Sequence, residues 1–444
     1  MRPGAAADDR IVAVGDEGTQ ILSLARPLGD SSDLAALVDQ LGSKRWVCLG
    51  EASHGTHEYY RWRAELSRQL IERNDVSYVA VEGDWPDCWR IDRWVRGLEH
   101  QSLDARELLG AFHRWPTWMW ANEEVADFIT WLRSRNLTRP EQDRTGFYGI
   151  DVYSLWDSLR EIFAWLDQHQ QAGLAAAQRA WRCFAPYGEE PYDYATASRL
   201  APLSCEPDVV DLLVDVRRRA LSRPAADDAA FGAVQNAEIV AGAERYYRVM
   251  LRGDRQSWNI RDRHMVDTVD RLSDRAGPRS RALIWAHNTH VGDARATDMA
   301  SAGMFNVGQL LRQRHGLDEV ALVGFAGHRG GVIAAGAWGA PERVLELPAA
   351  EAGSHEDLLH RVLGRPAVLV FGDDRSGPWL ASRRGHRAVG VVYQPRHEHG
   401  NYVPTVMGAR YDALVWFEET VPLWLLHHEA RSRDTEFETE PTGF

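Results

Sequence analysis

Short apolar runs alternate with amphipathic segments in the first part of the chain. Residues 45–50 and 77–82 are apolar runs that end in a glycine or an acid, a pattern typical of strands buried on both faces of a sheet. Between them, residues 57–73 carry apolar or aromatic side chains at helical spacing, and a helix is also expected over residues 32–41. The alternation of strand, helix and strand predicts a mostly parallel sheet with its functional loops at the carboxyl ends of the strands.

Six further segments are short, apolar and bounded by turn or charged residues, which is typical of strands. They are Gly146–Asp151, Arg281–Ala286, Glu319–Phe325, Ala367–Phe371, Ala388–Tyr393 and Ala413–Phe417. Because these segments are scattered along the chain, we expect one sheet assembled from distant pieces. Residues 155–272 show helical patterns and no strand pattern, so they predict an inserted group of helices.

The predicted fold is therefore α/β, with a mostly parallel central sheet flanked by helices and an inserted multi-helix segment that forms a lid or a cleft wall. We expect a flexible N-terminal lead-in over residues 1–30 and a flexible tail over residues 432–444, since both are rich in small or polar residues. The α/β catalytic domain is expected over residues 31–154 and 273–431, and the helical insertion over residues 155–272. A chain of 444 residues has room for one such unit with one main core.

Composition excludes several classes of protein. Apolar residues make up 44% of the chain and charged residues 26%, which is ordinary globular usage and argues against disordered, fibrous and membrane proteins. No stretch of about 18 apolar residues appears, and the first thirty residues are acidic where a signal peptide needs an apolar run. We therefore expect a cytoplasmic protein with no membrane partner.

The net charge indicates the class of ligand, and the cysteine spacing indicates the state of the thiols. A formal net charge of −13, with no run of basic residues, argues against nucleic acid and favours neutral or cationic small molecules. The four cysteines lack C-x-x-C spacing, and we expect reduced, buried thiols at Cys48, Cys88, Cys183 and Cys205. The sequence does not fix the oligomeric state.

An acid and an imidazole follow the first predicted strand. Glu51 and His54 lie three residues apart in the segment Gly50-Glu51-Ala52-Ser53-His54-Gly55, so the two side chains can meet. A carboxylate that orients a histidine makes it a better general base, and the flanking glycines let a substrate approach the backbone. The structural alternative is that Glu51 caps the next helix and His54 is an ordinary surface residue.

A second pair of titratable residues follows a later predicted strand. His287 and His290 lie three residues apart in Ile284-Trp285-Ala286-His287-Asn288-Thr289-His290. A lone histidine at the end of an apolar strand is more often a satisfied core residue than a catalyst. Two such clusters at two strand ends can converge in one crevice, and their coincidence favours function.

Two further carboxylates end predicted strands. Glu82 follows Val79-Ala80-Val81 without a break, so it should reach the same rim of the sheet. Its alternative role is to satisfy backbone N–H groups at the start of the next helix, a role that suits Asp84 or Asp87 equally well. Asp151, at the end of Tyr148-Gly149-Ile150-Asp151, is a weaker candidate that is as easily structural.

Tryptophans are dense between residues 85 and 131, where they could contact a bulky, ring-containing substrate or simply fill the core. The segment from Trp115 to Trp120 is the most promising place for substrate contacts. The chain has no G-x-S-x-G, P-loop, H-E-x-x-H or G-x-G-x-x-G motif after a strand. Ser53 is next to His54, but neighbours in an extended turn point apart, so a serine triad is not indicated.

Taken in order, these segments resemble the erythromycin esterase family. The matching blocks run from about residue 40 to residue 420: Gly50-Glu51-Ala52-Ser53-His54-Gly55, Val81-Glu82-Gly83, Trp120 to Glu123, Gly149-Ile150-Asp151, Arg261-Asp262, Trp285-Ala286-His287-Asn288-Thr289-His290 and Gly324-Phe325. The resemblance implies an α/β fold with inserted helices. It also implies a site that activates water and opens macrolide lactones without a covalent intermediate.

The resemblance also assigns roles to individual residues. His54 looks like the family's essential general base, with Glu51, His287 and His290 around it and Glu82 as a supporting acid. A basic residue is expected near Arg63, with Arg61 as its rival. Together with the aromatic segment, the matching blocks predict the following substrate contacts: Arg63, Trp118, Trp120, Asn122 and Asp151.

The mechanism predicted from these residues needs no cofactor. His54, oriented by Glu51, would deprotonate a water that attacks an ester or macrolactone carbonyl, and His287 or His290 would donate to the developing oxyanion or to the leaving oxygen. Several alternatives stay open at this point. A metal-dependent hydrolase could use Glu51, His54, His287 and His290 as ligands. A binding protein could keep the scaffold without catalysis, and a glycosidase could use Glu51 and Glu82.

Overall fold

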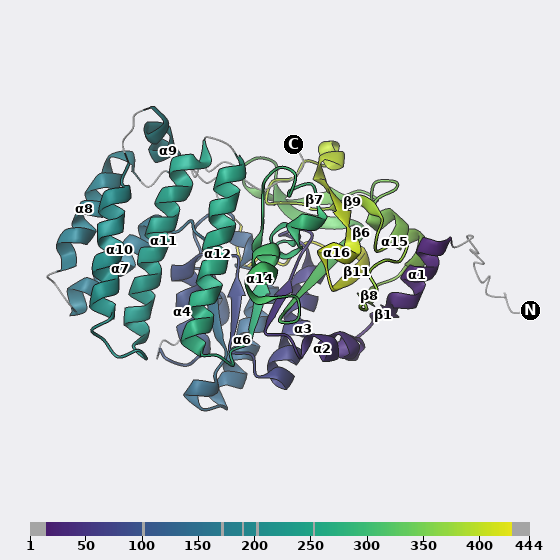
Figure 1. The fold of residues 1–444 in the computed structure, drawn as a ribbon, viewed down its shortest axis with the longest axis horizontal. Coiled ribbons are helices and arrows are strands. Elements are labelled where there is room, and N and C mark those ends of the chain that lie inside the picture. The colour runs from purple at the N-terminus through teal and green to yellow at the C-terminus, as the bar shows by residue number, and fades with distance from the viewer. Residues whose placement is uncertain are drawn as a thin grey trace, which may run out of the picture.

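The computed structural model describes residues 15–99, 103–169, 173–188, 191–200, 204–251 and 254–428, and a nine-stranded sheet runs through its centre (Figure 1). The strands lie in the order β1-β8-β11-β6-β2-β5-β3-β4, and β7 pairs with β6. Their bounds are β1 Ala25–Pro27, β2 Trp46–Leu49, β3 Tyr78–Val81, β4 Gly146–Gly149, β5 Ala282–Trp285, β6 Val320–Ala335, β7 Glu342–Leu347, β8 Ala367–Val370 and β11 Ala413–Thr420. A separate antiparallel pair joins β9 Arg383–Arg387 and β10 Tyr402–Val406.

Six neighbouring strands, from β11 to β4, are parallel. At the margins β7 and β8 run antiparallel to them, and β1 pairs antiparallel with β8. The predicted α/β class with a mostly parallel sheet is therefore confirmed. The register is level across the centre, because Trp285 lies opposite both Leu49 and Val81, and Val81 lies opposite Gly149. The residues that follow these strands consequently emerge side by side at one edge.

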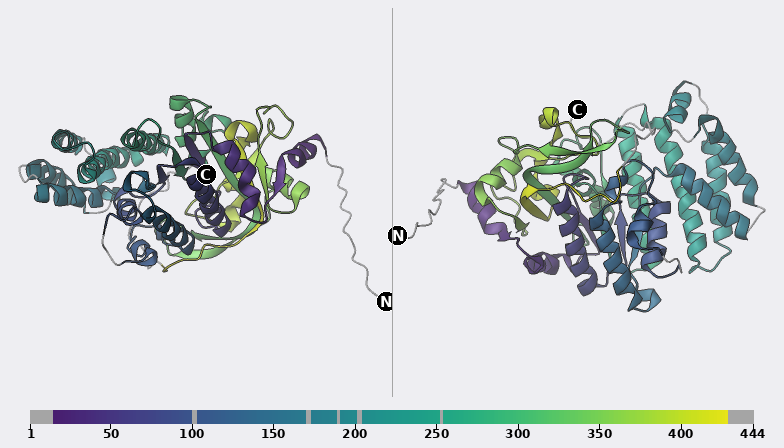
Figure 2. Two further views of the ribbon diagram at one scale, coloured as in Figure 1. Left: turned by 90° about the horizontal axis from the view of Figure 1, so that it is seen from below. Right: turned by 180° about the vertical axis from the view of Figure 1, so that it is seen from behind.

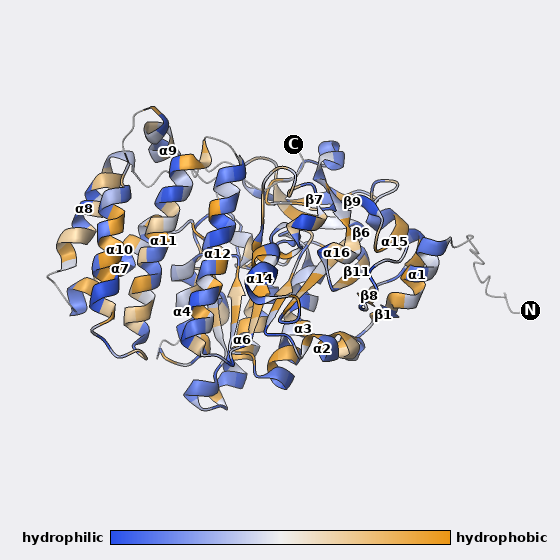
Figure 3. Ribbon diagram, in the orientation of Figure 1, coloured by the Kyte–Doolittle hydropathy of each residue, from blue (hydrophilic) through white to orange (hydrophobic). Residues whose placement is uncertain are grey.

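Helices cover both faces of the sheet. Alternate strand residues point to opposite sides: Val47 and Leu49 pack with α2, α3 and α6, whereas Trp46 and Cys48 pack with α12, α14 and α15. Figure 3 shows the hydrophobic strands at the centre and helices that combine hydrophobic and hydrophilic faces. The helices are α1 Asp16–Leu24, α2 Ala35–Leu41, α3 His57–Asn74, α4 Trp85–Val95, α5 Ala105–Leu109, α6 Glu123–Leu137, α7 Leu155–His169, α8 Leu174–Phe184, α9 Pro191–Leu200, α10 Glu206–Ala220, α11 Asp228–Met250, α12 Asp254–Ala276, α13 Asn288–Val291, α14 Val307–His315, α15 His355–Leu363 and α16 Met407–Arg410.

Helices α7 to α11 pack around a hydrophobic core of their own. In Figure 1 they stand side by side at the left, and the two views of Figure 2 show that they extend away from the sheet. Helix α12 joins this group to the sheet, since it contacts α11 and also packs Met265 and Val269 against the strands. Among the described residues, no helix is long and apolar enough to cross a membrane.

The sequence prediction of four reduced thiols is wrong for two of them. Cys183 in α8 and Cys205, which precedes α10, form a disulfide, whereas Cys48 and Cys88 are buried thiols. The packing of α8 against α10 brings together two cysteines that are 22 residues apart, and this proximity leaves no local sequence pattern. Because disulfides persist in oxidising compartments, this pair weakens the basis for the predicted cytoplasmic location.

Two predicted segments differ from the structure. The lead-in predicted over residues 1–30 contains α1 and β1, because Ile21 is buried and Gln20 accepts a hydrogen bond from the backbone of Trp379. Residues 1–14 and the predicted tail lie outside the described residues. The strand predicted over Ala388–Tyr393 is buried but forms only isolated bridges, one of which joins Val389 to Ser53. The apolar pattern of this segment reflects the burial of its side chains and not strand pairing in the sheet.

Replacing Gly55 with alanine should destabilise the fold. A Cβ atom at this position would lie 1.8 Å from the backbone oxygen of Ile333, and a backbone group cannot turn away as a side chain can. We expect the free energy of unfolding to fall by about 1–3 kcal/mol, the usual cost of forcing volume into a packed interior. Chemical denaturation measures this free energy of unfolding. Gly336→Ala is the control, because a Cβ atom at Gly336 would meet nothing within 4 Å. Equal stability of the two variants would contradict the close approach.

The disulfide predicts how many thiols react after denaturation. Without a reductant, alkylation should add two groups, at Cys48 and Cys88, and with a reductant it should add four. Mass spectrometry of the intact chain counts them. Closing a loop of this length stabilises a fold by about 3 kcal/mol, so a reductant should also lower the melting temperature. Four reactive thiols under both conditions would show that the bond does not form.

Candidate functional site

Four predicted site residues emerge from four neighbouring strands. Glu51 follows β2, His287 follows β5, Glu82 follows β3 and Asp151 follows β4, and these strands are adjacent in the sheet in that order. Hydrogen bonds from two backbone amides join the loops: the amide N of His287 donates to the side-chain Oε2 of Glu82 over 2.8 Å, and the amide N of Asn288 donates to the Glu51 carbonyl oxygen over 2.8 Å. The structure thus brings both predicted clusters to the same edge.

The Asn288 side chain ties the loop after β5 to β6. Its Nδ2 donates to the backbone oxygen of Phe325 over 2.7 Å, and its Oδ1 accepts from the backbone nitrogen of Phe325 over 3.3 Å. A Cβ atom on Gly50 would lie 2.1 Å from Asn288 Oδ1. The glycine at the end of β2 is therefore required by this close approach.

The first cluster is a buried Glu51–His54 pair backed by Arg63. His54 Nδ1 lies 2.7 Å from Glu51 Oε1, and Arg63 Nη1 lies 2.8 Å from Glu51 Oε2. All three side chains are at most 2% exposed. Arg61 is exposed and lies over Trp62, so Arg63 is the arginine that belongs to the cluster. Its contact is with Glu51, and this arrangement does not support the predicted substrate contact.

Two aromatic rings stabilise the charge of the buried Arg63 guanidinium. Its guanidinium lies 4.5 Å from the ring centre of Tyr60 and 4.8 Å from that of Trp285, which is cation–π geometry. The Tyr60 hydroxyl donates to the His54 carbonyl oxygen over 3.3 Å. Burial and the charge of Glu51 raise the pKa of Tyr60 well above its usual value, so its proton stays in place.

The second cluster surrounds His290 with two carboxylates. His290 Nδ1 lies 2.9 Å from Asp262 Oδ1, and its Nε2 lies 3.3 Å from Glu82 Oε1. Burial alone would lower the pKa of His290, but the charges of Asp262 and Glu82 outweigh it and raise that pKa to about 10. Burial also raises the pKa of Asp262, so the proton is held jointly by the pair. The His290 ring stacks on Trp258 with its centre 4.4 Å away.

Arg261 of α12 balances the carboxylates at the ends of β3 and β4. Its Nη2 donates to Glu82 Oε1 over 2.6 Å and to Asp151 Oδ2 over 2.7 Å. Burial would raise the pKa of Glu82, but the charges of His290 and Arg261 hold it well below its usual range. Glu82 is therefore an anion fixed by two cations, and Asp151 belongs to this ionic network.

His287 lies between the two clusters. Its ring centre is 4.8 Å from that of His54, and its Nδ1 lies 2.8 Å from Thr289 Oγ1. The backbone nitrogen of Thr289 also donates to this Nδ1 over 3.4 Å. In the tautomer that accepts both bonds, the proton of the His287 ring is on Nε2, which makes this nitrogen a hydrogen-bond donor.

A narrow cavity of about 50 Å³ adjoins Glu82, Asp151 and Arg261. Trp120, Trp338 and other groups complete its wall, whereas His54, His287 and His290 are not among the lining residues. A cavity of this volume holds a few water molecules. The three histidines are therefore not part of its wall.

Two of the predicted substrate contacts have partners within the chain. Asn122 caps α6: its Oδ1 accepts from the backbone nitrogen of Val125 over 2.9 Å, and its Nδ2 donates to the carbonyl oxygen of Trp118 over 2.8 Å. The Trp118 side chain is 1% exposed and packs edge-on against Trp115. Trp120 is the predicted tryptophan that reaches the cavity.

Sequence reasoning missed the residues of α12 that complete the site. Asp262 fixes His290 and Arg261 fixes Glu82, but both lie within a long polar helix where charged residues are ordinary. Their one sequence signal was the Arg261-Asp262 pair within the family resemblance. Trp258, one turn earlier in α12, left no signal of its own.

Two of the predicted alternative metal ligands, Glu51 and His290, already have charged partners. Both nitrogens of His290 face carboxylates, and Glu51 is shared between His54 and Arg63. Within the described part of the chain, one other group brings potential ligand atoms within 4.8 Å of one another: His328, His360 and Glu418.

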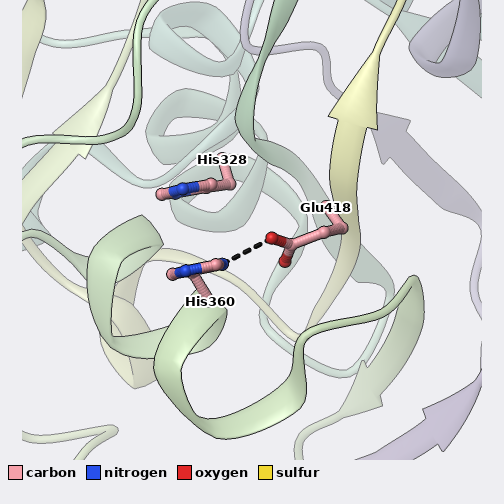
Figure 4. A group of neighbouring side chains, drawn as sticks. All are labelled: His328, His360 and Glu418. Carbon is pink, nitrogen blue, oxygen red and sulfur yellow. Dashed lines mark hydrogen bonds and ion pairs between the residues drawn. The ribbon is translucent and has the colours of Figure 1, made fainter.

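That second group is arranged as an ion pair beside a stacked ring (Figure 4). His360 Nδ1 bonds the Glu418 carboxylate, and the rings of His328 and His360 stack 3.8 Å apart at an angle of 2°. Parallel rings cannot direct their in-plane lone pairs at one ion. Burial and the charge of His360 lower the pKa of His328 to about 4, so the His328 ring is neutral at pH 7.

The raised pKa of His290 predicts how stability depends on pH. At pH values below about 6.5 the ring is protonated in both the folded and the unfolded chain, so the ion pairs contribute fully. Between pH 6.5 and about 10 only the folded chain keeps the proton, and the contribution falls by up to about 1.4 kcal/mol per pH unit. The stability of the wild type relative to His290→Asn should therefore decline over this range in denaturant titrations. A difference that stays constant would contradict the ion pairs.

Comparison with known proteins identifies the family of this chain. A model described as erythromycin esterase matches residues 71–420. Erythromycin esterase type II of Escherichia coli is 27% identical over 129 residues, and this match spans 29% of the chain and 28% of the relative's length.

Two solved structures share the fold. A succinoglycan biosynthesis protein superimposes with a TM-score of 0.73 at 17% identity, and the match covers 93% of this chain and 98% of that one. A mutant of erythromycin esterase EreC in its open conformation gives a TM-score of 0.63 at 18% identity, over 88% and 94% of the two chains. The family model extends over most of the sheet and over α12, and the chain belongs to the erythromycin esterase family.

Proposed function

We propose that this chain hydrolyses carboxylic esters or macrolactones with a water molecule activated by His54, and that no covalent intermediate forms. The observation that carries the proposal is the buried Glu51–His54 pair, with His287 beside it. Family membership supports the reaction class. The printed name of the Escherichia coli relative supports a macrolide as the first substrate to test.

His54 is suited to the role of general base. In the proposed tautomer Glu51 accepts a hydrogen bond from Nδ1–H over 2.7 Å, which leaves the basic lone pair on Nε2. This nitrogen accepts a proton from water as the oxygen attacks the carbonyl carbon, and Glu51 stabilises the imidazolium that forms. The proton then passes from His54 to the leaving alcohol oxygen. A proton transfer of this kind is worth about 10²–10⁴ in rate.

His287 is the better candidate for stabilising the oxyanion. Its Nδ1 is bonded by Thr289, so its Nε2 can donate, and its ring lies next to that of His54. His290 has a carboxylate at each nitrogen, and its positive charge is already compensated. Its role in this scheme is to fix Glu82, which in turn accepts the backbone N–H of His287.

Ser53, next to the proposed base His54, is hydrogen-bonded to another residue. Ser53 Oγ shares a hydrogen bond with Thr56 Oγ1, and both side chains are buried. A nucleophilic serine needs a hydrogen bond to its base, so this arrangement supports direct attack by water.

A bulky substrate needs more room than this cavity offers. A macrolide does not fit a cavity of about 50 Å³, so we infer that the segments around it move apart. The helical group that includes α12 is the candidate lid or cleft wall, because Arg261 links α12 to the strand ends. The lining carries four carboxylates and two guanidinium groups, which suits a substrate with a cationic substituent.

The His54→Ala variant should lose at least about 100-fold in turnover while keeping its fold, because the base is removed. Metal-stripped wild type and variant are incubated with a 14-membered macrolide and with simple esters, and a mass gain of one water is followed. His57→Ala is the matched control, since His57 forms the same kind of buried pair with Glu124, away from Glu51.

The outcomes separate the open alternatives. Hydrolysis by stripped wild type and by His57→Ala, but not by His54→Ala, supports the proposal. Activity in His54→Ala above about a tenth of wild type sinks the assignment of the base. Activity that appears only after zinc or manganese is added would favour a metal-dependent hydrolase, and saturable binding without product would favour a binding protein.

A further inference from the structure

A basic groove lies at the edge of the sheet opposite to the candidate active site. Its lining includes Ser77 and Tyr78 at the start of β3 and Arg281 directly before β5. These are the amino ends of strands whose carboxyl ends carry Glu82 and His287. The groove has a volume of about 1160 Å³, so it is far larger than the cavity beside Glu82.

The charge of this groove is opposite to that of the whole chain. Eight arginines and four carboxylates line it, although the chain has a net charge of −13. Three of the arginines have carboxylate partners: Arg73 pairs with Asp39, and Arg96 and Arg275 share Asp228. Within the described residues, the other five form no ion pair with a carboxylate: Arg135, Arg139, Arg144, Arg279 and Arg281.

Arg135 shows that these charges are not fully compensated. Its Nη2 donates to the Ile71 carbonyl oxygen over 3.1 Å, but its buried Nε has no hydrogen-bond partner. Burial and the neighbouring charge of Arg139 lower the pKa of Arg135. Arg135 has no carboxylate partner within the described residues, and an incoming anion would supply the missing negative charge.

Helix ends explain only part of this cluster. Arginines are favoured in the last turn of a helix, where the backbone carbonyls are partly negative, and Arg73, Arg135 and Arg275 occupy such positions. The remaining unpaired arginines lie in the connections around β4 and β5. They converge on the groove from segments that are more than a hundred residues apart, which is why no basic run appears in the sequence.

The chemistry of the lining points to phosphate groups. Guanidinium groups bind phosphate oxygens in pairs of parallel hydrogen bonds, and several of them spread along a groove match several phosphates better than one. The two tyrosines of the lining, Tyr78 and Tyr148, are buried and offer no surface on which bases could stack. Because these tyrosines offer no stacking surface, the lining favours a small polyphosphate over single-stranded nucleic acid.

We propose that this groove is a binding site for a small molecule carrying two or more phosphate groups. The site is separate from the ester-hydrolysing one, and it does not depend on the proposed activity. Helix α12 connects the two, because Arg275 lines the groove and Arg261 reaches Glu82 from the same helix.

Binding of inorganic tripolyphosphate to the full chain tests the proposal by isothermal titration calorimetry. The test variant Arg139→Ser/Arg279→Ser removes two guanidinium groups that lie outside helices, so its melting temperature should match that of wild type. The control variant Arg365→Ser/Arg396→Ser removes the same charge at exposed positions outside the groove. Wild type and control should bind with similar affinity, and the test variant should bind at least about tenfold more weakly.

Three outcomes would overturn the proposal. No saturable binding by wild type would do so, and equal weakening in the test and control variants would show that only overall charge matters. A single-stranded oligonucleotide that binds more tightly than tripolyphosphate would identify a different class of ligand. Because the readout is binding, failure here leaves the proposed hydrolysis untouched, and the converse also holds.

Discussion

The ionic contact between Arg261 and the carboxylates of Glu82 and Asp151 is the interaction on which the site depends. Three charges are taken out of water at the carboxyl edge of the sheet, and an unpaired charge in that position would cost several kcal/mol. The guanidinium comes from α12, so the contact also fixes the helical group against the strand ends. Glu82 then orients the backbone of His287, and Asp262, the next residue of α12, orients His290.

The two carboxylate–histidine pairs have different electrostatic surroundings, and this difference separates their roles. His290 lies between Asp262 and Glu82, with a pKa of about 10, and is therefore a structural cation at neutral pH. His54 shares its carboxylate with Arg63, so the negative charge of Glu51 is partly compensated before it acts on the imidazole. In the proposed mechanism, His54 is the ring that gains and loses a proton during turnover.

Local sequence patterns predicted the parallel strands and the polar residues that follow them, because a buried strand needs an unbroken apolar run and its end is marked by glycine or charge. The same patterns could not separate substrate contacts from supports, since Arg63 and Asn122 look alike in a sequence whether they face a ligand or a neighbouring loop. The disulfide, the partners supplied by α12 and the basic groove also escaped prediction. Each is formed by residues from distant segments, and the apolar run at Ala388–Tyr393 shows that burial can imitate a strand.

The central claim is that Glu51 holds the Nδ1 proton of His54 and so keeps Nε2 basic. The most direct test is the turnover of Glu51→Gln with the ester that the wild type hydrolyses fastest, alongside its melting temperature. An amide can donate to Nδ1 and so favour the tautomer that carries its proton on Nε2. The account predicts that kcat falls by about 10³–10⁴, with KM little changed and the fold retained. A folded Glu51→Gln protein with kcat within about tenfold of wild type would contradict it.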